Sequence, residues 1–201
     1  MRLIKTLDEI KGIKKANQII AKIYADIIPP YLKAGITTRE IDKIIDDYIR
    51  SCGARPACIG VEGFYGPFPA ATCISVNEEV VHGIPGDRVI KDGDIVSLDI
   101  VTELNGYYGD SAKTFAIGEI DEESKKLLEV TEKSREIGIE AAVIQRRAES
   151  LNEYGLRCLF VIPNTVRNLV QKRKDSSLDA LNDKRRYPDA NNCFLGKVLS
   201  Q

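Results

Sequence analysis

Histidine is almost absent from this sequence, because His82 is the single one among 201 residues. Most catalytic metal sites with imidazole ligands draw on more than one histidine, so His82 alone cannot build such a site. The five cysteines are sparse and include no Cys-x-x-Cys pair, which argues against a zinc knuckle. An odd number of scattered cysteines is typical of free thiols in a reducing compartment, and we therefore expect a cytoplasmic protein.

Long apolar runs are missing as well. No stretch of about 20 apolar residues occurs, so we expect no membrane span, and residues 1–5 do not resemble the start of a signal peptide. The formal net charge of −1 gives no global reason to expect binding to nucleic acid or to an anionic membrane. With 43% hydrophobic and 29% charged residues, the composition is that of an ordinary soluble domain, with or without a tail.

Two amphipathic helices are predicted before Gly53, which is a suitable stop for the second. Each begins with a capping box, Thr6 with Glu9 and Thr37 with Glu40, in which threonine and glutamate satisfy free backbone N–H groups. The proline pair at 29–30 should end or kink the first helix. Apolar residues recur at helical spacing, namely Ile10, Ile13, Ile20, Ile23, Tyr24 and Ile27, then Ile41, Ile44, Ile45, Tyr48 and Ile49.

Residues 54–118 differ in composition from the two predicted helices, because glycine and proline become frequent. Short β-type runs such as 71–76 and 95–101 lie between these glycines and prolines. Asn105-Gly106 is the strongest hairpin signal in the chain, since this dipeptide suits a two-residue type I′ turn. A third helix is predicted from about residue 121 to about residue 144.

The composition shifts again after residue 144. Residues 145–201 carry eleven lysines and arginines against six acidic residues and show poor hydrophobic periodicity. A basic, weakly patterned segment of this kind is typical of a solvated or poorly ordered chain. We therefore predict a folded domain over residues 1–144 and a divergent basic tail over residues 145–201.

The Asn105-Gly106 turn predicts where two carboxylates lie. A two-residue loop fixes the pairing of the strands on either side, so that Asp110 lies opposite Val101. Side chains alternate along a strand, so Asp99 and Val101 point to one face, which Asp110 shares. Asp99 and Asp110 are therefore diagonal neighbours with Cβ atoms roughly 7 Å apart.

Two carboxylates this close raise each other's pKa, and a divalent cation between them would relieve the repulsion. Oxygen ligands suit Mn²⁺, Fe²⁺, Co²⁺, Zn²⁺ or Mg²⁺. The alternative is that one or both carboxylates face solvent on an exposed sheet, and the spacing leaves both interpretations open. His82 precedes Gly83 and Pro85, which would hold the imidazole steadily toward a pocket, although a lone histidine at a strand end is more often structural.

Four segments, residues 35–42, 71–85, 91–100 and 107–115, together resemble the signatures of the bacterial-type (type I) methionine aminopeptidases. The match covers about residues 1–144, in order and with the spacing of that family. The resemblance implies an α/β (α+β) fold that is one half of a pita-bread fold, with an antiparallel sheet and helices on one face. It also implies metal-dependent removal of the initiator methionine from nascent polypeptides.

The same resemblance assigns roles to individual residues. Two divalent metal ions (Co, Mn, Fe or Zn) would be bound with Asp99 and Asp110 among their ligands. His82 would be a catalytic residue that contacts the substrate near the scissile bond. Phe64, Phe68 and Cys73 would line the pocket for the methionine side chain. The implied partners are the N-terminus of a nascent polypeptide and, as a candidate, the ribosome, with no membrane and no specific nucleic acid.

The second half of the family pattern does not follow. It would supply a histidine and two glutamates as further ligands, yet no histidine follows His82, and Glu149 and Glu153 lack a family-like context. The similarity stops abruptly after Ile144, as a truncation, a frameshift or a recombination would leave it. Three hypotheses stay open: an aminopeptidase whose missing ligands come from elsewhere, a non-catalytic binding module of the same fold, and a truncated or frameshifted fragment.

Overall fold

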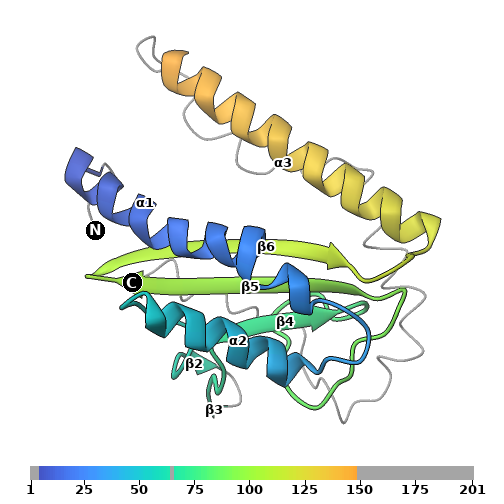
Figure 1. The fold of residues 1–201 in the computed structure, drawn as a ribbon. Helices are drawn as coiled ribbons and strands as arrows, with labels where there is room; N and C mark the ends of the chain where they lie inside the picture. Colours follow the sequence, from blue (N-terminus) through green and yellow to red (C-terminus); the bar gives the residue numbers. More distant parts are fainter. Residues whose placement is uncertain (1–4, 64–65, 149–201) are drawn as a thin grey trace. The chain divides into compact units, whose positions relative to one another are not determined.

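The computed structural model describes residues 5–63 and 66–148, and of residues 141–148 the backbone alone. The described residues belong to two compact units, the first ending at Ile120 and the second beginning at Asp121. The first unit contains two N-terminal helices and an antiparallel sheet, and the second contains one long helix (Figure 1).

Both N-terminal helices begin at the predicted capping boxes. Thr6 and Thr37 each accept a hydrogen bond from the backbone N–H three residues further on, and Glu9 and Glu40 reach back to the cap. The first helical stretch ends at the proline pair as predicted, since proline lacks an N–H to continue the ladder. The helical segments are α1 (Leu7–Lys22), the π-helical η1 (Ile23–Ile27), the 3-10 turn η2 (Pro29–Tyr31) and α2 (Thr38–Ser51).

Strand β5 is the centre of a four-stranded antiparallel sheet. Strand β6 pairs with the whole length of β5 along one edge. Along the other edge of β5, β4 pairs with one part of the strand and β1 with the next. Strands β2 and β3 form a separate small hairpin. The strands are β1 (Arg55–Pro56), β2 (Glu62–Gly63), β3 (Gly66–Pro67), β4 (Thr72–Val76), β5 (Ile95–Leu104) and β6 (Tyr107–Ala116).

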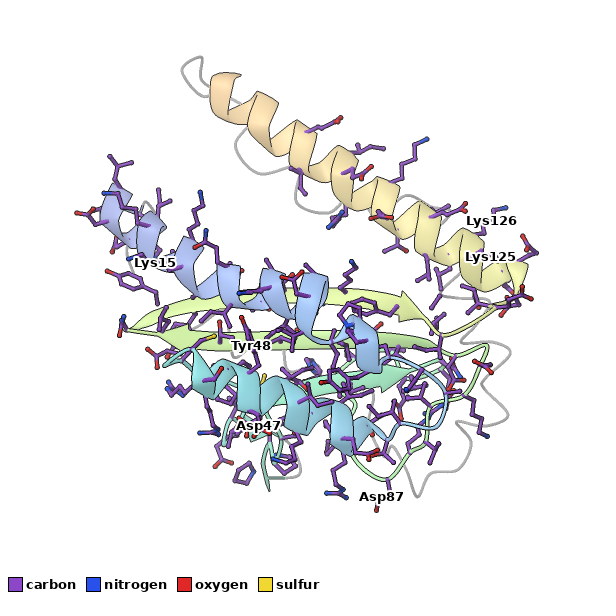
Figure 2. All side chains as sticks on the ribbon, viewed as in Figure 1. Lys15, Asp47, Tyr48, Asp87, Lys125 and Lys126 are labelled. Atoms are coloured by element: carbon purple, nitrogen blue, oxygen red, sulfur yellow. The ribbon has the colours of Figure 1, made fainter. Side chains whose placement is uncertain are left out.

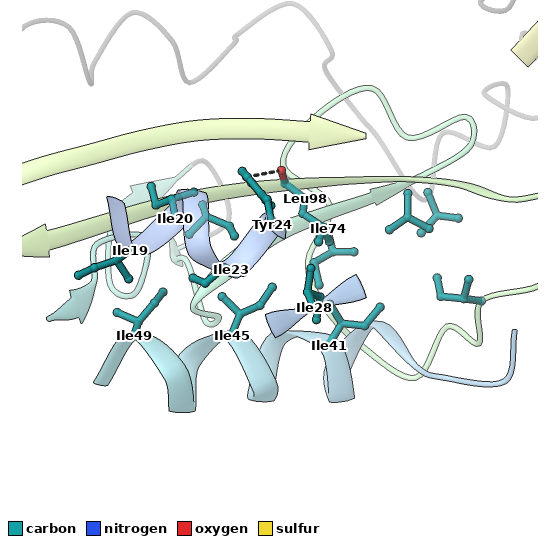
Figure 3. Close-up of a cluster of buried hydrophobic side chains, with 14 of the residues drawn as sticks. Ile19, Ile20, Ile23, Tyr24, Ile28, Ile41, Ile45, Ile49, Ile74 and Leu98 are labelled. Atoms are coloured by element: carbon teal, nitrogen blue, oxygen red, sulfur yellow. Dashed lines mark hydrogen bonds between the residues drawn. The ribbon is translucent and has the colours of Figure 1, made fainter. Parts of the chain in front are cut away.

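A core rich in isoleucine lies between the sheet and the helices α1 and α2 (Figure 3). Alternate residues of β5, namely Val96, Leu98 and Ile100, are fully buried in this core. Burial of each side chain contributes roughly 1.5–3 kcal/mol to the free energy of unfolding. Both helices therefore cover the same face of the sheet, which confirms the predicted fold class. The helical segments contribute Ile19, Ile20, Ile23, Tyr24, Ile41, Ile45 and Ile49.

Helix α1 crosses β6 closely at Gly109. A Cβ atom on Gly109 would lie 2.7 Å from the backbone carbonyl carbon of Ala16. On the neighbouring strand the buried Thr102 hydroxyl donates a hydrogen bond to the Ala16 carbonyl oxygen at 3.2 Å. The backbone N–H of Asp110 donates to Oδ1 of Asn17 at 3.3 Å. Backbone packs on backbone here because the strand has no side chain at this position.

The described part of the second unit contains α3 (Glu122–Ala148), which begins where the sequence predicts. Asp121 accepts hydrogen bonds from both the backbone N–H and the hydroxyl of Ser124, at 2.8 and 2.6 Å, and so caps the helix. The helix runs past the predicted end near residue 144, because the residues that follow are good helix formers. Within the described ranges, no helix is both long and apolar enough to cross a membrane.

Replacing Gly109 by alanine should push α1 away from β6, because the new methyl group would overlap the Ala16 backbone. Overpacking of this kind costs about 1–3 kcal/mol, so calorimetry of the 201-residue chain should show a melting temperature lower by about 2–12 °C. Gly138→Ala is the control, since a Cβ atom there meets nothing within 4 Å and alanine favours the helix. An unchanged melting temperature for G109A would contradict this packing.

Candidate active site

The two predicted carboxylates lie on the face of the sheet opposite the helices. Asp110 pairs with Val101 in the β5–β6 ladder, which is the register that the sequence predicts. Asn105 and Gly106 have φ angles of 54° and 82°, and both must be positive in a type I′ turn. The predicted hairpin geometry, with Asp99 and Asp110 as diagonal neighbours, is therefore confirmed. Asp99 is half-buried and Asp110 is more exposed.

The surroundings of both carboxylates disfavour their negative charge. Burial raises the pKa of Asp99, and the charge of Asp110 raises it further, whereas His82 acts in the opposite direction. Partial burial also raises the pKa of Asp110. A cation between the two groups would offset these effects, and hard carboxylate oxygens fit Mn²⁺ or a similar ion. Asp99 and Asp110 would supply two ligands, so other donors or water would complete the coordination of any ion bound there.

Strand β4 places Cys73 directly opposite Asp99 in the ladder. Asp42 of α2 fixes the beginning of β4, because its Oδ1 accepts hydrogen bonds from the Thr72 backbone N–H at 2.8 Å and from the Thr72 hydroxyl at 2.9 Å. Burial raises the pKa of Asp42 above its ordinary value, although the bonds from Thr72 act to lower it. Asp42 is therefore a positioning residue for the strand that carries Cys73.

His82 lies in the loop after β4, and this loop folds back onto the strand. The Gly83 carbonyl accepts a hydrogen bond from the Ile74 N–H at 2.9 Å, and the Gly83 N–H donates to the Ser75 hydroxyl at 3.1 Å. A Cβ atom on Gly83 would overlap the Ile74 carbonyl group, so only glycine permits this approach. As a result, Nδ1 of His82 lies 3.8 Å from Sγ of Cys73.

A second thiol, that of Cys58, forms a hydrogen bond with the Cys73 thiol. This hydrogen bond lowers the pKa of Cys58. The pKa of Cys73 is raised by the same hydrogen bond, by burial and by the negative charge of Asp99. Cys73 therefore presents a neutral, weakly polar thiol. The role of Cys58 was not predicted from the sequence, because its spacing to Cys73 fits no motif.

The two aromatic residues predicted to line a methionine pocket stay predictions. Phe68 follows β3 and is half-buried, and its backbone bonds to Gly60 and Val61, each at 2.9 Å, tie it to the small β2–β3 hairpin. Phe64 lies outside the described residues.

Tyr24 is a further residue of the site region that the sequence did not reveal. Its hydroxyl lies 3.0 Å from the Leu98 carbonyl oxygen and 2.6 Å from that of Ser111, so it joins β5 to β6 from the core side of the sheet, behind the carboxylates. Burial raises the pKa of Tyr24, and the charges of Asp99 and Asp110 add to the effect. Its place in an apolar helical stripe gave no sign of this polar contact.

Comparison with known proteins gives consistent matches. Residues 11–159 match the model of metallopeptidase family M24. Methionine aminopeptidase 1 of Bacillus subtilis is 44% identical over 152 residues, which are 76% of this chain and 59% of that protein. The crystal structure of methionine aminopeptidase from Thermotoga maritima matches with a TM-score of 0.63 and 38% identity. That from Rickettsia prowazekii matches with a TM-score of 0.64 and 32% identity.

Each of these two structural matches covers 69% of this chain and 54% of the other chain. The chain thus spans about 60% of the length of the curated relatives that it matches. These solved neighbours have the pita-bread fold, so the predicted relation of the first unit to that fold is confirmed.

Replacing Asp42 by asparagine should weaken the start of β4, because the amide NH₂ group cannot accept a hydrogen bond from the Ala71 N–H. The expected loss in the free energy of unfolding is about 1–3 kcal/mol, measured by urea denaturation. Asp47→Asn on the same helix is the control, since Asp47 is exposed and pairs with Lys43 on the surface (Figure 2). Equal denaturation midpoints for the two variants would show that Asp42 does not hold the strand.

Proposed function

The chain belongs to metallopeptidase family M24, and from this membership we propose that it carries the first half of a metal-dependent methionine aminopeptidase site. The observation that supports this most directly is the pair Asp99 and Asp110 on one face of the β5–β6 hairpin, with His82 near Asp99. The substrate would be the N-terminus of a nascent polypeptide that begins with the initiator methionine.

In this proposal Asp99 and Asp110 are ligands of two divalent cations, for which Co²⁺, Mn²⁺, Fe²⁺ and Zn²⁺ are candidates. A cation bound there would activate a water molecule and polarise the peptide carbonyl. His82 contacts the substrate next to the scissile bond, and the Gly83 backbone fixes the position of its loop. The hairpin register already holds the backbone positions of the two carboxylate residues as diagonal neighbours, so only their side chains have to be ordered.

Cys73, Phe64 and Phe68 would form the walls of the pocket for the methionine side chain. A thioether is polarizable and packs well against sulfur and aromatic rings. Cys73 is 7% exposed and carries a neutral thiol, so it suits an apolar side chain better than a charged one.

A non-catalytic binding module is the second candidate function. The single histidine of the chain favours it, because the ligand set implied by the family resemblance needs another one. Such a module would bind nascent chains through the same pocket without turnover.

We also propose a cytoplasmic location, a domain boundary near residue 144, and contact of the basic segment 145–201 with the ribosome.

If the chain is catalytic, the purified 201-residue protein with added Co²⁺ or Mn²⁺ should release free methionine from a Met-Gly-type peptide. Asp110→Ala should abolish the release, because one of the two carboxylate ligands is lost. Asp87→Ala is the matched control and should retain the wild-type rate, since Asp87 is an exposed partner of Arg39 on the periphery (Figure 2). Release that survives in D110A would refute the proposed role of the carboxylate pair.

The binding module is tested on the same protein by NMR, with the imidazole resonance of His82 as the probe. Paramagnetic Mn²⁺ bound by the carboxylates should broaden the NMR resonance of His82, and Asp110→Asn should reduce the broadening. Broadening without methionine release, together with a cooperative melt, would support the module. If neither methionine release nor broadening is observed, the proposed binding of a cation by Asp99 and Asp110 is overturned in both candidate functions.

A further inference from the structure

Three donor groups of different chemistry converge beside the carboxylate pair. Among the described residues, the ligand atoms of Cys73, His82 and Asp99 lie within 4.8 Å of one another. Cys73 is buried, while His82 and Asp99 are half-buried. Asp110, the second carboxylate of the proposed aminopeptidase site, is not a member of this group.

The spacing within the group suits a small tetrahedral cation. Zinc lies about 2.3 Å from a thiolate sulfur and about 2.0–2.1 Å from an imidazole nitrogen, which puts those two ligand atoms about 3.6 Å apart. The distance from Sγ of Cys73 to Nδ1 of His82 is 3.8 Å, so these two donors already stand close to that separation. The Asp99 carboxylate oxygen lies within 4.8 Å of the other two donor atoms, so a movement of up to about 1.5 Å would complete a three-donor set.

The chemistry of the donors also selects the ion. A carboxylate pair favours hard cations, whereas a thiolate and an imidazole favour borderline or soft ions such as Zn²⁺. We propose that Cys73, His82 and Asp99 form a mononuclear zinc site, which shares Asp99 with the Asp99–Asp110 pair and excludes Asp110, with water in the fourth position. Cys73 releases its thiol proton to solvent when the sulfur–metal bond forms.

The backbone holds the three donors in place before any ion arrives. Cys73 and Asp99 face each other across the β4–β5 ladder, so their Cα atoms keep a fixed separation. His82 is anchored to the same strand through the two backbone contacts of Gly83. Little ordering is therefore needed when an ion binds, which strengthens binding by a three-residue site.

Zinc at this site would withdraw Asp99 from the pair that it forms with Asp110. It would also occupy Cys73, assigned above to the pocket for the methionine side chain, and His82, assigned above to substrate contact. A thiophilic ion should therefore compete with the hard cation of the carboxylate pair. The zinc site itself does not depend on peptide hydrolysis and exists even if the chain is not an enzyme.

Titration of the thiol-reduced chain with Co²⁺, a spectroscopic substitute for Zn²⁺, tests the proposal. A near-ultraviolet sulfur-to-cobalt charge-transfer band should appear, saturate at one ion per chain and disappear when Zn²⁺ is added. Cys73→Ser should abolish the band, and His82→Asn should weaken Co²⁺ binding by at least about tenfold. Cys52→Ser is the matched control and should keep the band, because Cys52 is an exposed thiol outside the group.

The outcome also separates this site from the proposed aminopeptidase site. Asp110→Asn should leave the charge-transfer band intact while it impairs the Mn²⁺-dependent effects described above. A second measurement uses the wild type alone and therefore does not depend on whether Cys73→Ser folds. In the wild type, Zn²⁺ should shift the NMR resonance of the His82 imidazole, the single one in the chain. No band and no shift in the wild type would overturn the zinc site, as would a band that persists in C73S.

Discussion

The register of the β5–β6 hairpin is the constraint on which both the core and the site depend. Because side chains alternate along β5, this register sends Leu98 and Ile100 into the core and Asp99 to the opposite face. A slip by one residue would bury Asp99 among isoleucines and expose Leu98. An unpaired buried carboxylate costs several kcal/mol, which is a large part of the stability of a domain. The packing of the core therefore maintains the geometry of the site.

Close backbone approach at two glycines completes the arrangement. Gly109 lets α1 lie directly on β6, next to the strand position of Asp110. Gly83 lets the His82 loop bond to β4, next to Cys73. In both places a side chain would separate segments that must touch, so the two glycines serve the site through packing and take no part in the chemistry.

Asp99 lies between two kinds of neighbour. On the β6 side Asp110 offers a hard carboxylate, and on the β4 side Cys73 and His82 offer softer donors. Burial and the charge of Asp110 both raise the pKa of Asp99, so a cation on either side would stabilise its charged form. In the two proposals made above, one carboxylate belongs to two different ligand sets, and the identity of the cation would decide which set forms.

The sequence by itself determined what is local. The capping boxes at Thr6 and Thr37 start their helices, and the Asn105-Gly106 turn pairs the strands that hold Asp99 and Asp110. Only the tertiary structure decided the pairing of β4 with β5, the closeness of Cys73 to His82, and the supporting bonds of Asp42 and Tyr24. These contacts join residues that are not linked by a short turn. Their positions follow from how whole elements pack around the core, and no local propensity encodes that packing.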